Sequence, residues 1–194
     1  MSNTLSKIIK SSIDILNKKG VTKFGIRILV REMKIGHSTI YKYVKGKMGL
    51  YSLICEHICE AVFKNLSEYE IKNNPKNYLL NLCNKLRDEL LKIRNSAAIF
   101  YETIPSTPNH IELKPNIIKA LLALGVKEEK AFSLACIIFN YIIFSVWDEE
   151  FFRLVSITNK QDQSLIFYKN HLKKMDYNEH FQYGLDLIFM AILP

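Results

Sequence analysis

The stretch FGIRILVREMKIGHSTIYKYVKGKMGL, residues 24–50, constrains the fold more than any other part of the chain. Its apolar residues recur at helical spacing in two short runs, which predicts helices over about 26–33 and 37–43 joined by a tight turn. In the second helix Ile40 and Val44 share the inner face, so its polar side chains are left mostly outside. A short helix with outward hydrogen-bonding groups in a basic setting suits the major groove of DNA.

Positive charge is concentrated around this stretch. Residues 1–50 contain nine Lys and two Arg but only two acidic residues, Asp14 and Glu32, which gives a net charge of +9. The whole chain carries a formal net charge of +8, so the remainder is close to neutral. Such a basic segment favours a phosphate polyanion as partner, because binding releases counterions. A solvated basic face is the alternative that charge alone leaves open.

Length and composition favour a mainly helical globular protein. A chain of 194 residues with 48% hydrophobic residues can bury a substantial core in one or two domains. Seven Gly and five Pro are too few for a loop-rich β fold. No apolar run approaches the roughly 20 residues that cross a membrane, and charge interrupts the N-terminal segment where a secretory signal would be apolar. We therefore expect an all-α, cytoplasmic protein.

Helical periodicity continues along the rest of the chain. It predicts further helices over about 4–19, 47–66, 76–94, 97–101, 111–124, 127–153 and 179–193, and a short one within 165–173. Polar links are expected over 67–75, 103–110 and 156–164. We expect Asn178 to cap the last helix, and Gly184 to let another backbone approach closely.

The four cysteines lie in apolar helical stretches, which is typical of reduced core thiols. Cys55 and Cys59 share a helix face at a spacing of four residues. A zinc site is the alternative for this pair, although His57 points elsewhere and no second such pair exists. We expect no cofactor and no metal site.

The segment STIYKYVKGKMGL resembles the recognition helix and following turn of the tetracycline repressor (TetR) family. The residues that fit the family pattern in order are Thr39, Ile40, Tyr41, Val44, Lys45, Lys47 and Leu50. The segment FQYGLDLIFMAIL is similar to the closing helix of tetracycline-repressor-type C-terminal domains. The resemblance implies a helix-turn-helix DNA-binding domain over residues 1–48 and a helical effector-binding and dimerisation domain over residues 49–194.

The resemblance also assigns contacts to double-stranded DNA. Groove-facing positions of the family are occupied here by His37, Ser38, Thr39, Lys42 and Tyr43. Arg27 falls where the tetracycline repressors carry an Arg that reads a base, and a guanidinium can hold guanine through two hydrogen bonds. Phosphate contacts are expected from Thr39, Tyr41, Lys45 and Lys47, although a partly buried ring is the alternative for Tyr41. Because Lys42 and Tyr43 replace an aromatic residue and a His, the operator sequence should differ.

An effector site is implied in the body, between the fourth and eighth predicted helices. In the tetracycline repressors this site binds a drug–magnesium chelate, but the positions of two of its His residues carry Phe63 and Phe100 here. We therefore expect a hydrophobic or aromatic small-molecule effector rather than tetracycline. Aromatic walls also suit a cationic ligand. The candidate pocket residues are Phe63, Leu82, Leu86, Phe100, Tyr101, Thr103, Phe139, Ile143 and Trp147. Simple filling of a core is the alternative for each.

These patterns predict a ligand-released repressor that binds a palindromic operator as a homodimer. The two long apolar helices near the C-terminus would pair with their copies in a four-helix bundle, or bury each other within one subunit. An enzyme is not expected, because the Gly-rich phosphate loop, HExxH and GxSxG motifs are missing from the sequence. A helical interaction or lipid-carrier module with a basic membrane-facing head is the other alternative, but the polar recognition face argues against membrane insertion.

Overall fold

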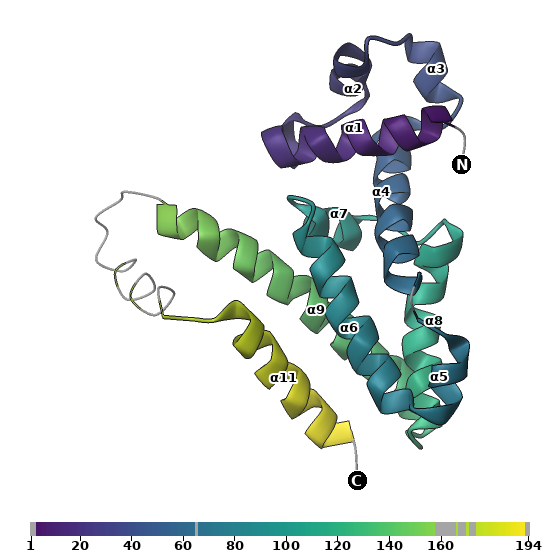
Figure 1. Ribbon diagram of the computed structural model, residues 1–194, viewed down its shortest axis with the longest axis vertical. Helices are drawn as coiled ribbons and strands as arrows, with labels where there is room; N and C mark the ends of the chain where they lie inside the picture. The colour runs from purple at the N-terminus through teal and green to yellow at the C-terminus, as the bar shows by residue number, and fades with distance from the viewer. Residues whose placement is uncertain (1–2, 65, 158–165, 167–169, 171–173, 193–194) are drawn as a thin grey trace.

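The computed structural model describes residues 3–64, 66–157, 166, 170 and 174–192, and the secondary structure of these residues is entirely helical (Figure 1). The elements are α1 (Asn3–Lys19), a 3-10 turn (Val21–Lys23), α2 (Ile26–Met33), α3 (His37–Tyr41), α4 (Gly46–Phe63), α5 (Glu68–Asn73), α6 (Pro75–Leu91), α7 (Ser96–Glu102), α8 (Pro108–Ala123), α9 (Glu128–Ile157) and α11 (Tyr177–Ile192). The all-α expectation is therefore confirmed. The expected loop over 156–164 and helix within 165–173 fall largely or wholly outside the described residues.

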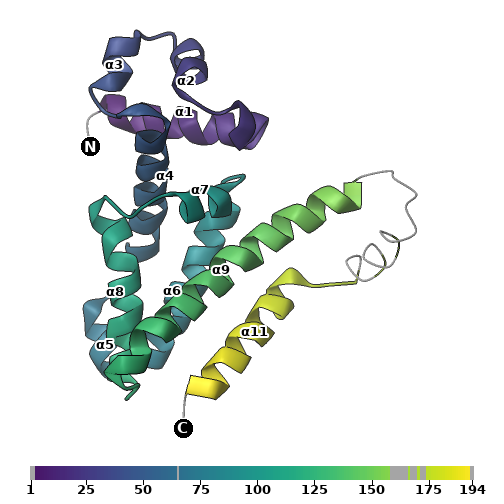
Figure 2. The ribbon, with the colours of Figure 1, turned by 180° about the vertical axis from the view of Figure 1, so that it is seen from behind.

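A small head and a larger helical body are joined by one helix. Helices α1, α2 and α3 form the head, and α4 runs from it into the body, where it packs against α6 and α8 (Figures 1 and 2). Helix α9 packs on α6, α7 and α8, and α11 lies along α9. The helix α4 begins two residues before the domain boundary expected at residue 48, and that division stays a prediction.

The head is built as its sequence pattern indicates, with one strained residue in the turn. Ile40 and Val44 are buried beside Leu29, so the inner face of the helix pair is the apolar one. Lys34 ends α2 in the left-handed conformation at φ 54°. A side chain in that region costs on the order of 1 kcal/mol. Helix α3 ends at Tyr41, two residues earlier than expected, and its chain continues as a turn closed by the Val44 amide donating to the Ile40 carbonyl at 3.1 Å.

Two of the polar links expected from the sequence contain helix. Residues 68–73 form α5, because the Ser67 hydroxyl accepts from the Tyr69 amide at 3.2 Å and Ile71 is buried against the body. Helix α8 begins at Pro108, inside the expected loop 103–110, since proline is well suited to the first helical turn. The preceding α4 ends at Phe63 rather than Leu66.

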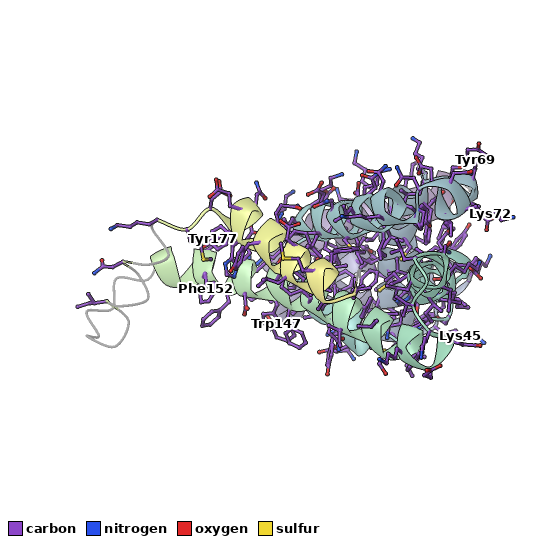
Figure 3. All side chains as sticks on the ribbon, turned by 90° about the horizontal axis from the view of Figure 1, so that it is seen from below. Lys45, Tyr69, Lys72, Trp147, Phe152 and Tyr177 are labelled. Carbon is purple, nitrogen blue, oxygen red and sulfur yellow. The ribbon has the colours of Figure 1, made fainter. Side chains whose placement is uncertain are left out.

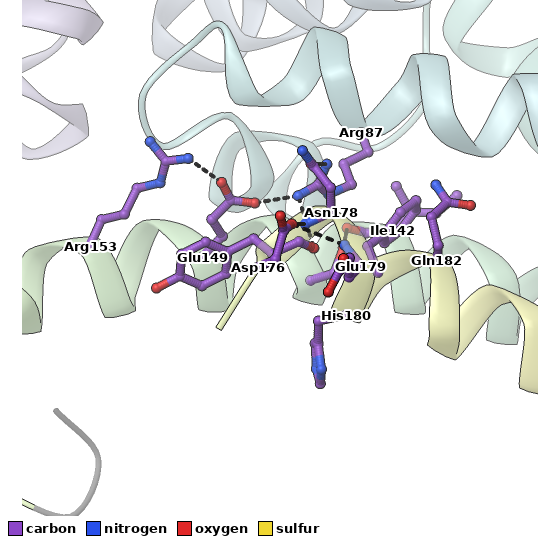
Figure 4. Close-up of polar contacts among 12 residues, drawn as sticks. Arg87, Ile142, Glu149, Arg153, Asp176, Asn178, Glu179, His180 and Gln182 are labelled. Carbon is purple, nitrogen blue, oxygen red and sulfur yellow. Dashed lines mark hydrogen bonds and ion pairs between the residues drawn. The ribbon is translucent and has the colours of Figure 1, made fainter. Parts of the chain in front are cut away.

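The start of α11 corrects the expected cap. The Asp176 carboxylate accepts from the backbone amides of Asn178 and Glu179, at 2.8 and 3.1 Å, and therefore caps the helix. Asn178 does not cap, because its side-chain oxygen accepts instead from the Arg87 guanidinium at 2.8 Å (Figure 4). Arg87 also pairs with Glu149 at 2.5 Å, and both side chains are almost fully buried, so α6, α9 and α11 meet at one internal ion pair.

Gly184 allows a close approach of a ring rather than of a backbone. A Cβ built on Gly184 would lie 2.1 Å from the Tyr141 hydroxyl oxygen, closer than any side chain could tolerate. Tyr141 stacks on Phe181 and donates to the Phe181 carbonyl at 3.0 Å. The absence of a side chain at Gly184 therefore lets α9 and α11 pack together through Tyr141.

Helix α9 contains a long apolar stretch. Within Glu128–Arg153, an 18-residue stretch has a mean hydropathy of 1.6, and 39% of that stretch is buried inside the protein. By length and composition alone, this helix could cross a membrane. The expectation that no such run exists was wrong. Ala131, Ala135, Ile138, Ile142 and Val146 form its buried face, so this helix is a central part of the body core.

The cysteines are free thiols, as expected. Cys55, Cys59 and Cys83 are buried and Cys136 is partly buried. Burial raises the pKa of the Cys55 and Cys83 thiols to about 12 and raises that of Cys59 as well. These thiols therefore stay protonated at neutral pH, which disfavours both metal ligation and oxidation.

Candidate nucleic-acid interface and effector pocket

The outer face of α3 and its following turn presents polar side chains to solvent. His37, Ser38, Tyr41, Lys42 and Tyr43 are exposed, and Thr39 is partly exposed. Tyr41 is 56% exposed, so its ring is not a core residue. The buried Ile40 holds the helix against the head, which leaves a face of hydroxyl, imidazole, phenol and ammonium groups available to base edges or phosphates. Their contacts with DNA stay a prediction.

A basic groove lies beside this face. It has a volume of about 880 Å³ and runs between the end of α1, the start of α2 and the start of α4. Arg27 and Lys47, both predicted from the sequence, line it together with Tyr41. Cationic residues that the sequence reading did not single out also line it, namely Lys18, Lys19, Lys23 and Arg31. These residues come from the end of α1, the 3-10 turn and α2, and only the fold shows that they line one groove.

Lys47 is placed for an anion. It is the second residue of α4, where the free backbone amides of the helix start favour negative charge. Its ammonium lies 5.2 Å from the centre of the buried Tyr51 ring. Lys19, in contrast, is paired with Glu32 at 2.5 Å, so part of the groove is already neutralised. Lys45 precedes α4 and is exposed.

A cavity of about 260 Å³ in the body brings together part of the predicted effector site. Phe100, Tyr101, Thr103 and Phe139 line it, at the end of α7 and along α9. Lining residues not predicted from the sequence are Glu102, Ile104, Pro105, His110, Leu113, Lys114 and Asn140. His110 was missed because residues 103–110 were expected to form a loop. Leu113 and Lys114 lie in a helix that was expected over 111–124, but the sequence did not show that this helix faces the cavity.

The other predicted effector residues do not line this cavity. Leu82, Leu86 and Ile143 are fully buried and form part of the body core. Phe63 is partly buried against that core, whereas Trp147 is 41% exposed and points away from the body (Figure 3). Any role of these five residues in binding an effector stays a prediction.

The cavity is in contact with the helix that carries the head. The Glu56 carboxylate, on α4, accepts from the Asn109 and His110 amides at 3.0 and 3.2 Å and so caps the start of α8. The Ser106 hydroxyl lies 3.2 Å from that of Ser52, one turn earlier on α4. Because His110 also lines the cavity, the cavity wall is hydrogen-bonded directly to α4.

His110 is buried, which favours the neutral form of its imidazole. Its ring lies 4.8 Å from the centre of Phe100, and burial lowers the pKa of the imidazole, partly opposed by the nearby Glu56 carboxylate. Its Nδ1 atom has no hydrogen-bond partner within the described part of the chain. The site therefore holds a polar group whose bonding capacity is unused.

A second polar contact joins the head to the body. The Asn95 side-chain oxygen accepts from the Val21 amide at 3.0 Å, and the Asn17 side-chain oxygen accepts from the Arg94 amide at 2.8 Å. The Asn95 amide in turn donates to Glu150 of α9 at 2.8 Å. Burial raises the pKa of the Glu150 carboxyl, and this hydrogen bond partly opposes the rise. The link between α1 and α2 is thus tied to α9 through a few hydrogen bonds.

The outer faces of α9 and α11 carry exposed apolar side chains at helical spacing. On α9 these are Ile137, Phe144, Trp147 and Phe151, and on α11 they are Tyr183, Leu187 and Met190. Phe144 stacks on Trp147 with ring centres 6.0 Å apart. We call these seven residues the apolar face. Exposed large apolar side chains gathered on neighbouring helices are typical of a protein–protein contact.

A family model of the tetracyclin repressor-like C-terminal domain matches residues 73–192. The chain belongs to the TetR family. This match covers well over half of the sequence and includes α6, α9 and α11, so it identifies most of the body as the C-terminal domain of a TetR-family regulator. No curated protein matches the chain by sequence alone.

Solved structures of the TetR family share the fold at low sequence identity. A possible TetR family regulator from Streptomyces coelicolor A3(2) superposes with a TM-score of 0.79 at 19% identity, covering 97% of this chain and 98% of that one. ActR from Streptomyces coelicolor, solved in complex with actinorhodin, gives 0.74 at 18% identity, with 99% and 96% covered. TetR from Acinetobacter baumannii AYE gives 0.72 at 19% identity, with 96% and 94% covered.

Proposed function

We propose that this TetR-family regulator is a repressor that binds a palindromic DNA operator as a homodimer and is released by a small-molecule effector. The observation that carries the proposal is the exposed polar face of α3 beside a groove lined by Lys and Arg. Phosphate contacts would supply affinity and the α3 side chains would supply sequence preference. Two copies would place α3 in successive major grooves, roughly 34–36 Å apart.

The apolar face supports the homodimer. Its seven side chains lie on α9 and α11, which belong to the body and, within the described residues, do not pack on the head helices α1–α3. Pairing two copies through these helices would therefore leave both heads free. A two-fold arrangement would bury the same residues on both subunits in a four-helix contact. The head-to-head spacing would then depend on the angle of α4 relative to α9.

The effector would act through the contacts that link the 260 Å³ cavity to α4. Filling the cavity would shift the start of α8, and Glu56 and Ser52 would pass that shift to the connecting helix. The hydrogen bonds of Asn17 and Asn95 would have to adapt for the head to turn. An effector that prefers the turned state would lower DNA affinity by shifting the population. Related structures hold actinorhodin and minocycline, which supports a small-molecule effector.

Substitution of two groove residues tests the proposal. Arg27→Ala is expected to weaken operator binding by about 1–3 kcal/mol and to flatten the preference for operator over random duplex, because Arg27 would read a base. Lys47→Ala should weaken binding to both duplexes equally, because Lys47 would contact phosphate. It should also reduce the slope of log affinity against log salt concentration by about one. Fluorescence anisotropy with both duplexes at several salt concentrations measures this.

The control is Lys72→Ala, which removes an exposed Lys from α5, at the end of the body remote from the head (Figure 1). It should leave both affinities unchanged. An equal loss on operator and random duplex for Arg27→Ala would contradict a base-reading role. Unchanged binding for both groove variants would contradict the placement of the interface.

A further inference from the structure

The effector pocket is small and has apolar walls. Its volume of about 260 Å³ is lined by Phe100, Leu113 and Phe139 among other residues. Drug-sized ligands usually occupy pockets of about 300–1,000 Å³, so this one suits a smaller molecule. The apolar part of such a molecule would lie between the aromatic rings.

Three polar groups at the pocket have hydrogen-bonding capacity that the described residues leave unused. The Lys114 ammonium lies 4.5 Å from the centre of the Phe139 ring, and no carboxylate within the described residues forms an ion pair with it. Asn140 follows Phe139 on α9 and is exposed, and its side-chain amide makes no hydrogen bond within the described residues. The buried His110 adds a ring nitrogen, Nδ1, that is also without a partner there.

The charge at the pocket favours an anion over a cation. Lys114 is only partly exposed and packs on a ring, so its charge is screened less than that of a surface Lys. Glu102 also borders the pocket, but it is exposed on the last turn of α7. A carboxylate held by an ammonium and amide donors gains charge-assisted hydrogen bonds that a neutral or cationic head group would not.

Resting on the proposed function, we infer that the effector is a small organic acid: a carboxylate on an aromatic or aliphatic body, with Lys114 as its counter-charge. Phe100, Leu113 and Phe139 hold the apolar body. Asn140 and His110 are the neighbouring polar groups available to the carboxylate. An anionic effector takes the place of the cationic effector that the aromatic walls of the pocket would also accept.

Three probes of one shape test the ligand class. Phenylpropanoate, phenylpropanamide and phenylpropylamine share an aromatic body and differ in the charge of the head group. Calorimetric titration of the full chain should show phenylpropanoate binding at least about tenfold tighter than the other two. Tighter binding of the amine, equal binding of all three, or no binding of the acid at millimolar concentration would overturn the inference.

Lys114→Gln separates the proposed counter-charge from general effects. This variant should lose the acid preference, with about a tenfold weaker affinity for phenylpropanoate and an unchanged affinity for the amide. Lys119→Gln is the matched control, because it makes the same change on an exposed side chain of the same helix and should bind like the unaltered protein. An acid preference that persists in Lys114→Gln would overturn the assignment.

DNA binding, measured separately, distinguishes this inference from the proposed function. If the protein prefers phenylpropanoate through Lys114 but binds no duplex DNA, the ligand class stands and the repressor proposal fails. If it binds an operator but shows no Lys114-dependent acid preference, the repressor proposal stands and the ligand class fails.

Discussion

Replacing Glu149 by glutamine is expected to lower the free energy of unfolding by about 3 kcal/mol, because it leaves the Arg87 guanidinium buried without a counter-charge. The two side chains are 5% and 3% exposed and lie 2.5 Å apart, so water cannot take the place of the carboxylate. Glu149 also pairs with Arg153, but that side chain is mostly exposed, so loss of this second ion pair should change the free energy of unfolding little. Arg87 in turn orders the start of α11 through Asn178 and the Tyr177 carbonyl, so that helix should loosen first (Figure 4).

Denaturant unfolding at one fixed protein concentration measures this change, because dimer formation would make stability depend on concentration. Glu129→Gln, on the exposed first turn of the same helix, is the control and should change stability by about 1 kcal/mol or less. The double variant Arg87→Met with Glu149→Met should recover much of the loss, since it removes both buried charges together. A stability of Glu149→Gln close to that of the unaltered protein would contradict a structural role for the pair.

Introducing a carboxylate into the apolar face is expected to separate the subunits. Leu187 is 49% exposed on α11, between Tyr183 and Met190. In a two-fold contact Leu187→Glu appears on both subunits, and each buried carboxylate without a partner costs several kcal/mol. Sedimentation should then show a monomer. Operator affinity should fall by more than about a hundredfold, because each head would bind its half-site alone.

Gln182→Glu is the matched control for this change. Gln182 is exposed on the same helix but contacts Asn84 of α6, so it lies on a different side from Leu187. This variant adds the same charge and should remain dimeric with unchanged operator affinity. If Leu187→Glu also stays dimeric and binds the operator fully, the subunits must pair through some other surface.

The head could be predicted from sequence in detail because its contacts are local. The spacing of Ile40 and Val44 is enough to define which side of α3 faces inward, and the cations that precede it are close in the chain. The helix α5 was also open to prediction, since Ser67 followed by Glu70 is a capping pattern at a helix start. The polar composition of residues 67–75 favoured a link, but the capping pattern and the apolar Ile71 favour the helix that forms.

The body depends on contacts between distant residues, which one sequence does not reveal. Glu56 reads as a surface acid on α4, and only the fold places it at the start of α8. Asn178 looks like a helix cap, but Arg87 draws its side chain away and Asp176 takes that role. The lining of the pocket differs from the expected one for the same reason. His110 comes from a segment that was expected to be a loop, and Lys114 comes from an expected helix whose packing against α9 one sequence does not reveal.

Selection of bound sequences from a pool of random duplex DNA tests the central claim most directly. The account predicts enrichment of a two-fold symmetric site whose half-sites lie about one helical turn apart, or a multiple of that, because paired subunits would set two α3 helices into the major groove. Enrichment of no sequence, or of one lacking two-fold symmetry, would contradict it.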